Sequence, residues 1–362
     1  MNILVVGGSN SLLKNGYVQH LEQALAARMP VTVRQLSVGA TSSLAAIGRL
    51  FETAGNMEVD VILYEYSIND AGHFAWRPDG GASWLLCLHL LIKAAAQLYP
   101  NAVFVPLVFA MQRFASPAVR DPFYDFQVEW FARLGLSTID VRRWLADLFL
   151  DHPPAWLYGD EAHYATPQAT ALIGCEIARR LLVARTQDAP LSAIWERLQT
   201  ISPHGSLEMA YVPAAGLAQF VSGPAELMLD GNRLMQLTFL RMREGSTLAL
   251  RTEMFPLALY LKSDAQHDSV RLSLESAGVS GTVTTGTRHV ATDALRFVCC
   301  NVPVPLLFGH QLAVSFGTTA FEIAMTPGTA APVANFDCFG MGIPAPDRHF
   351  DLCGILFVAR AA

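Results

Sequence analysis

The chain has 362 residues, of which 52% are hydrophobic and 15% charged, so it can bury a large core and is long enough for two domains. Its net charge of −6 is mild, and no cluster of Lys and Arg indicates a nucleic-acid or anionic-membrane surface. The mean hydropathy is positive, but polar residues interrupt the most apolar segment, 84–98, at His89, Lys93 and Gln97. This pattern is typical of a buried helix and not of a membrane span.

Cysteine and histidine usage gives no sign of a metal site. The six cysteines lack Cys-x-x-Cys spacing and most lie in apolar runs, which predicts free thiols in a reducing compartment. No basic segment precedes the first strand-like run, so we expect a cytoplasmic protein. His152, His163 and His204 are isolated, and Cys299 and Cys300 are adjacent, so we expect neither a metal nor another cofactor.

The first half of the chain alternates strand-like and helical runs. The strand-like runs are continuously apolar and rich in β-branched residues, which implies a parallel sheet covered by helices on both faces. We therefore expect a doubly wound α/β domain over residues 1–188. The strand-like runs are 2–6, 31–36, 59–66, 102–108 and 137–141, and the helical runs are 17–29, 42–54, 82–99, 123–134 and 167–184.

After residue 188 the pattern changes. A helix over 192–198 lies within an expected linker, 189–205. From 206 to 362, short runs with alternating polarity are separated by Gly, Pro and Asp, which predicts an antiparallel β-sandwich. Carbohydrate binding, homo-oligomer formation and shaping of the cleft all stay open as its role. The runs are 234–242, 246–254, 257–263, 269–276, 296–302, 311–317, 320–325 and 354–359.

The first strand-like run ends in Gly7-Gly8-Ser9-Asn10-Ser11, which has three interpretations. In the first, a polar residue caps the following helix. In the second, the glycines form a dinucleotide-binding turn, but the Gly-x-Gly-x-x-Gly spacing and the Lys-Ser/Thr pair of a P-loop are both absent. In the third, Ser9 is a nucleophile at the carboxyl end of the first strand, where open α/β sheets bind ligands.

A serine nucleophile needs a base and a group that orients the base. Asp160 and His163 lie three residues apart, just before the helical run that begins at Pro167. In a loop, the carboxylate can accept the imidazole Nδ1–H and leave Nε2 to face a hydroxyl. The motif alone is weak, because Asp160 or Thr166 would serve equally well as a helix cap.

Two further segments follow the second and third strand-like runs. One carries Gly39 and the other carries Asn69 and Asp70. Each has a simpler explanation as a turn. However, the carboxyl ends of parallel strands meet at one edge of a sheet. Four separate segments would thus bring a serine, a glycine, an asparagine and the Asp–His pair together, which favours the catalytic interpretation.

The order Ser, Gly, Asn, His, with a terminal Asp-x-x-His, resembles the SGNH hydrolase (GDSL-like esterase and lipase) superfamily. The resemblance implies that Ser9 is the nucleophile and that Asp160 and His163 form its base pair. It also implies that Gly39 and Asn69 form the oxyanion hole with the N–H of Ser9. The family fold is a flavodoxin-like three-layer α/β/α sandwich whose five parallel strands have the order 2-1-3-4-5.

Two positions depart from the family pattern. The first block usually reads Gly-Asp-Ser, and here Gly8 stands in place of the Asp. The third block usually reads Gly-x-Asn-Asp, and here Ser67 stands in place of the first Gly. Neither change removes a reacting group. The Gly-Ser-Asn-Ser form resembles a divergent bacterial branch associated with polysaccharide or capsule biosynthesis.

We therefore expect a serine esterase that removes an acyl group, with acetyl as the first expectation, from a carbohydrate through an acyl-Ser9 intermediate. If a sugar hydroxyl replaced water, the same site would be an O-acyltransferase. A third alternative is a scaffold that binds acylated glycans without turnover. The intact Ser, Asp and His argue against this last alternative, because binding alone does not need all three.

The segment after Asn69 reads as a long loop that carries His73, Trp76 and Arg77. These residues are expected to line the substrate cleft, with Trp76 stacking on a sugar ring. A Trp in a loop rich in Pro and Gly can also pack onto the core, and the two interpretations stay open. The expected partner is a small-molecule or glycan ester.

Overall fold

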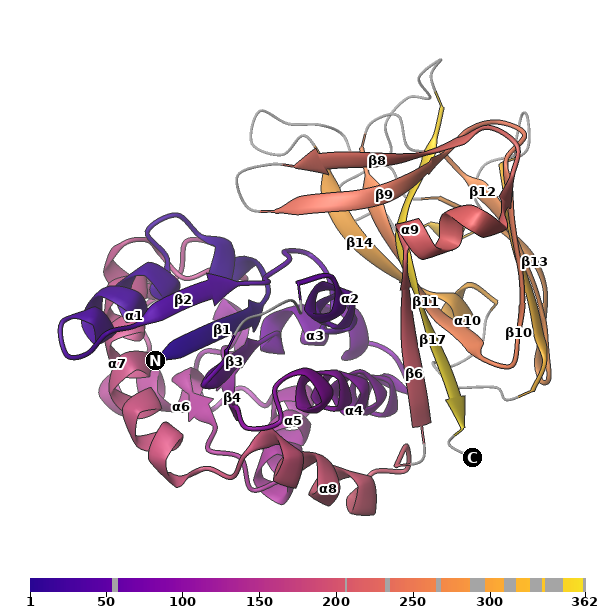
Figure 1. Ribbon diagram of the computed structural model, residues 1–362. Coiled ribbons are helices and arrows are strands. Elements are labelled where there is room, and N and C mark those ends of the chain that lie inside the picture. The colour runs from indigo at the N-terminus through magenta and orange to yellow at the C-terminus, as the bar shows by residue number, and fades with distance from the viewer. Residues whose placement is uncertain are drawn as a thin grey trace. The chain divides into compact units, whose positions relative to one another are not determined.

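The computed structural model describes residues 1–53, 58–205, 207–231, 235–264, 268–286, 297–308, 317–325, 334–335 and 348–360. The chain divides into two compact units, Met1–Gly205 and Ser206–Ala362. The first unit is α/β and the second is all-β, as the sequence predicts (Figure 1).

The first unit is built on a parallel sheet with the predicted strand order, β2-β1-β3-β4-β5. β1 and β3 pair from Ile3 opposite Val61 to Gly7 opposite Glu65, so their polar ends reach the same edge. β3 and β4 are buried along their whole length, because helices cover both faces. The elements are β1 (Asn2–Gly7), η1 (Ser9–Leu12), α1 (Tyr17–Ala26), β2 (Thr32–Gln35), α2 (Leu44–Thr53), β3 (Val61–Glu65), α3 (Ser67–Phe74), α4 (Gly80–Leu98), β4 (Val103–Val108), η2 (Gln112–Phe114), α5 (Pro122–Arg133), β5 (Ile139–Asp140), α6 (Val141–Leu148), η3 (Ala155–Leu157), α7 (Gln168–Gln187) and α8 (Leu191–Ile201).

Alternate residues of the strands feed two hydrophobic layers, one on each side of the sheet. On one side, α1, α6 and α7 pack against the strands with fully buried side chains such as Leu21 and Ile177. On the other side, the ring of Tyr64 lies edge-on to Phe131 of α5, which also meets Trp84 of α4 at a centroid distance of 5.6 Å. The sheet is therefore the middle layer of a three-layer sandwich.

α4 is long and apolar enough to cross a membrane by length and composition alone. Most of its residues are buried within the protein, including His89 and Lys93. This burial agrees with the expectation of a core helix.

Three segments of this unit differ from the expected pattern. Residues 67–74 form α3 and residues 141–148 form α6, and neither helix was expected, although α6 buries Val141 and Leu145 four residues apart on one face. Residues 71–81, expected as a long loop, therefore belong largely to the end of α3 and the start of α4. The segment 189–205, expected as a linker with a helix over 192–198, does contain a helix, α8, but it belongs to the first unit. The N–H of Leu191 donates to Ala102 O at 2.8 Å, and Arg197 Nη1 donates to Leu134 O at 2.8 Å.

The second unit consists of two sheets with the strand orders β16-β13-β12-β15-β10-β7 and β14-β11-β17-β9-β8, and β6 pairs with β17. Apart from the parallel pair β13–β16, the described pairs are antiparallel. The elements are β6 (Leu207–Pro213), α9 (Ala214–Leu217), η4 (Ala218–Phe220), β7 (Val221–Ser222), β8 (Ala225–Gly231), β9 (Gln236–Met242), β10 (Thr247–Thr252), β11 (Phe255–Ser263), β12 (Val270–Ser276), β13 (Val279–Gly286), β14 (Val298–Pro303), α10 (Val304–Leu307), β15 (Thr319–Ala324), β16 (Ala334–Asn335) and β17 (Phe350–Arg360).

Five described strands of the second unit were not expected from the sequence: β6, β7, β8, β13 and β16. β13 is rich in Gly, Ser and Thr, and β8 leaves Leu227 and Leu229 half or more exposed, so neither shows a clear buried face. Pairing with neighbours decides such strands more than local propensity does. The expected run 311–317 lies almost entirely outside the described residues. The described cysteines are free, as predicted, and Cys338 also falls outside the described residues.

Candidate active site

Ser9 lies immediately after β1, at the start of the short helix η1. Gly8 holds the N-cap position and makes no side-chain capping bond. The hydroxyl of Ser9 instead lies 2.8 Å from His163 Nε2. The capping interpretation of Ser9 is therefore not what the structure shows, and its hydroxyl is directed to the imidazole.

Asp160 and His163 form the other half of this arrangement. His163 Nδ1 lies 2.9 Å from Asp160 Oδ1 and 2.8 Å from Oδ2. A carboxylate can only accept there, so Nδ1 carries the proton and Nε2 is left as the acceptor for the Ser9 hydroxyl. Ser9 is 154 residues away from His163 along the chain, yet the side chains of Ser9, His163 and Asp160 form one continuous hydrogen-bonded line.

The loop that carries Asp160 and His163 is closed by its own backbone. The N–H of Gly159 donates to His163 O at 2.8 Å, and Asp160 Oδ1 accepts from the N–H groups of Ala162 and His163 at 2.8 and 2.9 Å. Partial burial opposes ionisation of Asp160, but these donors and the imidazole outweigh it and lower the pKa of Asp160. Asp160 is thus held as a carboxylate beside the imidazole.

Asn10 joins the nucleophile turn to this loop. Its Nδ2 donates to Ala162 O at 2.8 Å, and its Oδ1 accepts from the N–H of Tyr164 at 3.2 Å. Asn10 is 2% exposed, so both bonds lie within the protein. Sequence reasoning did not single out Asn10, although its place directly after the serine was a signal.

Gly39 lies beside Ser9. A Cβ built on Gly39 would be 3.3 Å from Ser9 Cβ. The turn that carries Gly39 is fixed to the first strand, because the N–H of Val38 donates to Gly7 O at 2.9 Å. It is also closed by a bond from Thr41 Oγ1 to Val38 O at 3.0 Å.

Asn69 lies in the first turn of α3, with its carboxamide against Gly8. A Cβ on Gly8 would fall 1.9 Å from Asn69 Oδ1. The glycine that departs from the family pattern is therefore the residue that leaves room for this carboxamide. In the described part of the chain, no recorded hydrogen bond uses the Ser9 or Gly39 N–H or the Asn69 amide as donor. Gly39 thus lies beside Ser9, and the Asn69 carboxamide lies beside Gly8.

Asp70, read from the sequence as a turn former, is instead a fully buried acceptor. It accepts from the N–H of Ser43 at 2.8 Å, from Tyr64 OH at 2.9 Å and from Trp84 Nε1 at 3.1 Å. Burial outweighs these donors and raises the pKa of Asp70 to about 7. Because Ser43 follows the Gly39 turn and Asp70 follows Asn69, this carboxyl connects the two segments.

The three residues expected to line the cleft lie at the end of α3 and just beyond it. Trp76 is 73% exposed, so it does not pack onto the core, and its Nε1 donates to Gly72 O at 3.2 Å. The Arg77 guanidinium lies 5.4 Å from the Trp76 ring centroid and pairs with Asp79. Desolvation lowers the pKa of His73. A hydrogen bond between His73 and the backbone of Ala40, next to Gly39, opposes that shift. His73 therefore borders the Gly39 turn.

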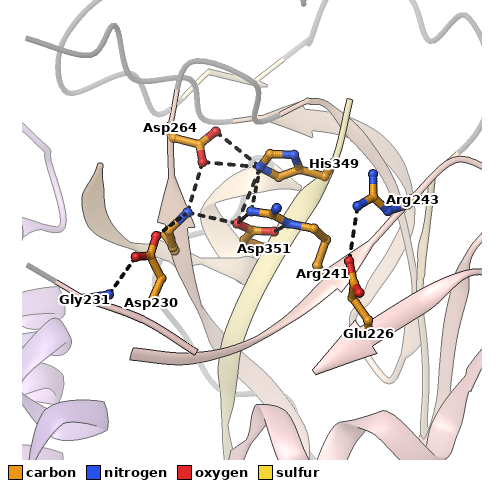
Figure 2. A network of polar contacts seen from close by, with 9 residues as sticks. Glu226, Asp230, Gly231, Arg241, Arg243, Asp264, His349 and Asp351 are labelled. Atoms are coloured by element: carbon orange, nitrogen blue, oxygen red, sulfur yellow. Dashed lines mark hydrogen bonds and ion pairs between the residues drawn. The ribbon is translucent and has the colours of Figure 1, made fainter. Parts of the chain in front are cut away.

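In the second unit, the structure brings together ligand-type groups that their spacing in the sequence did not reveal. Ligand atoms of Asp264, His349 and Asp351 all lie within 4.8 Å of one another (Figure 2). Lys262 Nζ lies 3.0 Å from Asp264 and 3.2 Å from Asp351, and Arg241 Nη2 lies 2.7 Å from Asp351. Lys262 also lies 3.6 Å from Asp230, so these residues form one ion-pair network.

No protein-family model matches the sequence, and no curated protein matches it. Solved structures do match. One is a two-domain esterase active on acetylated mannans, co-crystallised with mannopentaose. It is 10% identical with a TM-score of 0.63, and the match covers 100% of this chain and 91% of that one. Another structure of a two-domain esterase active on acetylated mannans is 12% identical with a TM-score of 0.59, covering 100% and 92%.

An acetyl xylan esterase is 13% identical with a TM-score of 0.41, and the match covers 51% of this chain and 99% of that one. At these identities the likeness concerns the fold. The chain shares the fold of the two-domain esterases, with a five-stranded α/β unit followed by an all-β unit. The strand order of the first unit is the one that the resemblance of the motifs implies.

Proposed function

We propose that the protein is a serine esterase that removes an acyl group, acetyl in the first instance, from a carbohydrate. The observation that carries the proposal is the line from Ser9 Oγ through His163 to Asp160, with both links between 2.8 and 2.9 Å. Donor, base and orienting carboxylate are at hydrogen-bond distance with the imidazole in the required tautomer.

In the first step, Ser9 Oγ attacks the ester carbonyl while His163 Nε2 takes the hydroxyl proton. The N–H groups of Ser9 and Gly39 and the amide of Asn69 donate to the oxyanion. The C–O bond to the sugar then breaks, His163 returns the proton to the leaving oxygen, and acyl-Ser9 remains. Water attacks that ester with His163 as base, the carboxylic acid leaves, and the Ser9 hydroxyl is restored.

The choice of a carbohydrate ester is supported by two features. The similarity in fold covers both domains of esterases that act on acetylated mannans. Trp76 offers an exposed indole face of the kind on which sugar rings stack, with the charged Arg77 beside it. The Gly-Ser-Asn-Ser motif adds the further proposal of a branch that modifies polysaccharides during their biosynthesis.

The test is hydrolysis of p-nitrophenyl acetate and release of acetate from acetylated mannan, with Ser9→Ala beside the wild type. We expect loss of about 10⁴-fold or more in kcat with an unchanged melting temperature. Ser192→Ala, on α8, is the matched control and should keep full activity. Full activity in Ser9→Ala would overturn the proposal.

Two outcomes would favour the alternatives. If added mannan oligosaccharide diverts the acetyl group from water, the protein is an O-acyltransferase that uses the same residues. If the protein binds acetylated mannan but neither hydrolyses it nor reacts with a phosphonate at Ser9, it is a binding scaffold. Mass spectrometry of the phosphonate adduct separates the last case from a merely slow enzyme.

A further inference from the structure

A second buried carboxyl lies next to the nucleophile and has no part in the mechanism above. Glu65 ends β3, where it stands opposite Gly7 in the pairing with β1, and its exposed fraction is 0%. A single acidic residue at the end of a fully buried strand needs a reason to be there, because an unpaired buried charge is costly.

The contacts of Glu65 flank Ser9 on both sides. The N–H of Gly8 donates to Glu65 O at 2.8 Å and lies 3.3 Å from Oε2. Ser11 Oγ donates to the same Oε2 at 2.9 Å and is 2.8 Å from Tyr17 OH. From the neighbouring strand, the carboxyl of Glu65 thus contacts the residue before Ser9 and the side chain two residues after it.

Among the residues that the structure describes, Glu65 takes part in no ion pair. The titratable groups that face it are Tyr17 from α1, Tyr66 and Asp70 around the start of α3, and Tyr164 after the catalytic loop. Burial, the largest effect, raises the pKa of Glu65 to about 8, so the carboxyl carries a proton at neutral pH.

We propose that Glu65 is a positioning residue for Ser9, whose carboxyl, through Gly8 and Ser11, holds the turn that presents the nucleophile to His163. The proposal rests on the proposed esterase function. Ionisation of Glu65 would place a negative charge under the turn whose N–H groups receive the oxyanion. That charge opposes the developing negative charge in the transition state.

The experiment measures kcat and KM for p-nitrophenyl acetate from pH 6 to pH 10, with the Ser9→Ala rate subtracted as background. In the wild type we expect kcat to fall above about pH 8 with little change in KM. Glu65→Gln keeps a neutral acceptor for Ser11 and Gly8 and cannot ionise, so its kcat should stay near the neutral wild-type value and remain level to pH 10.

Glu65→Leu removes the acceptor and keeps an apolar side chain of similar size. We expect it to lower kcat by about 10- to 100-fold at pH 7 with KM nearly unchanged. If the Leu variant does not fold, the Gln profile alone decides. An alkaline fall that persists in Glu65→Gln, its absence from the wild type, or a folded Leu variant with wild-type kcat would overturn the proposal. Activity in Ser9→Ala would instead overturn the esterase function itself.

Discussion

Asn69 occupies the space that any side chain at position 8 would need. A Cβ on Gly8 would lie 1.9 Å from Asn69 Oδ1 and 2.5 Å from its Cγ, well inside contact distance. The identity of residue 8 and the position of a proposed oxyanion donor are therefore linked. A glycine next to the nucleophile is a steric requirement of this particular site.

Gly8→Ala should displace the Asn69 carboxamide and lower kcat by about 10- to 100-fold. Gly72→Ala is the matched control, because a Cβ at Gly72 would meet no atom within 4 Å. On the exposed part of α3 it should stabilise the fold by up to about 1 kcal/mol. Steady-state kinetics and a melting curve of both variants check this. An unimpaired Gly8→Ala enzyme would show that the position of Asn69 is unimportant for turnover.

Asn69→Ala tests the donor itself. The loss of one oxyanion donor lowers kcat by about 10²- to 10³-fold with little change in KM. If Asn69 were only a structural residue of α3, the same substitution would lower the melting temperature and leave kcat per folded molecule intact. Kinetics on protein quantified by active-site titration distinguishes the two results.

Asp160→Asn should cost less activity than His163→Ala. The base is removed in the second variant, whereas the first disturbs only the tautomer and the charge beside it. In a serine hydrolase the two losses differ by about 10²-fold in kcat. Asp160 has 60% of its side chain exposed, so solvent shares in stabilising the imidazolium. Equal losses in the two variants would argue against a purely orienting role for Asp160.

The contribution of Glu65 and Asp70 to stability should fall as the pH rises from about 4 to about 8. In this range the unfolded chain has released the protons of Glu65 and Asp70, whereas burial raises the pKa of Glu65 to about 8 and of Asp70 to about 7 in the folded protein. The native state binds more protons, so their contribution is complete below pH 4 and is lost as the pH passes the folded values. Urea unfolding of wild type and Glu65→Gln at pH 5 and pH 8 checks this. Between pH 5 and pH 8, the free energy of unfolding should fall less in the variant than in the wild type. An equal change in both proteins would contradict the assignment to Glu65.

Trp76→Ala should raise KM for acetylated mannan by about 3- to 10-fold, the equivalent of one aromatic stacking contact, and leave p-nitrophenyl acetate kinetics unchanged. Trp156→Ala, at an indole that is 53% exposed and packs edge-on to Phe149, is the control. Equal effects on both substrates would mean that Trp76 maintains the structure of the site and does not bind the glycan.

The parallel sheet could be predicted because β3 up to Tyr64 and the whole of β4 are apolar and are separated by periodic helices, whereas the strand order came from the resemblance of the motifs to the SGNH hydrolases. The hydrogen bonds that polar side chains form between distant segments could not be predicted. Nothing near Asp70 in the sequence says that Ser43, Tyr64 and Trp84 converge on it. α3 was missed because its eight residues include Asn69, Asp70 and Gly72, all poor helix formers, and its packing against α4 and the buried Asp70 override that propensity.

The ion-pair network of the second unit shows the same limit. Lys262 and Asp351 are far apart in the sequence, and each in isolation reads as a surface residue. Their side chains are 3% and 0% exposed because adjacent strands β11 and β17 bring them into register. Register is set by the whole sheet, so no local pattern reports it.

The two hydrogen bonds of Asn10 hold the turn that carries Ser9 against the loop that carries His163, although 154 residues separate Ser9 from His163. The base loop cannot lift away from the serine without releasing the Tyr164 amide from Asn10. Exchange of that single amide proton with solvent therefore measures how often the loop that carries His163 separates from Ser9. The exchange rate of the Tyr164 amide thus reports the stability of the assembled site without the need for a substrate.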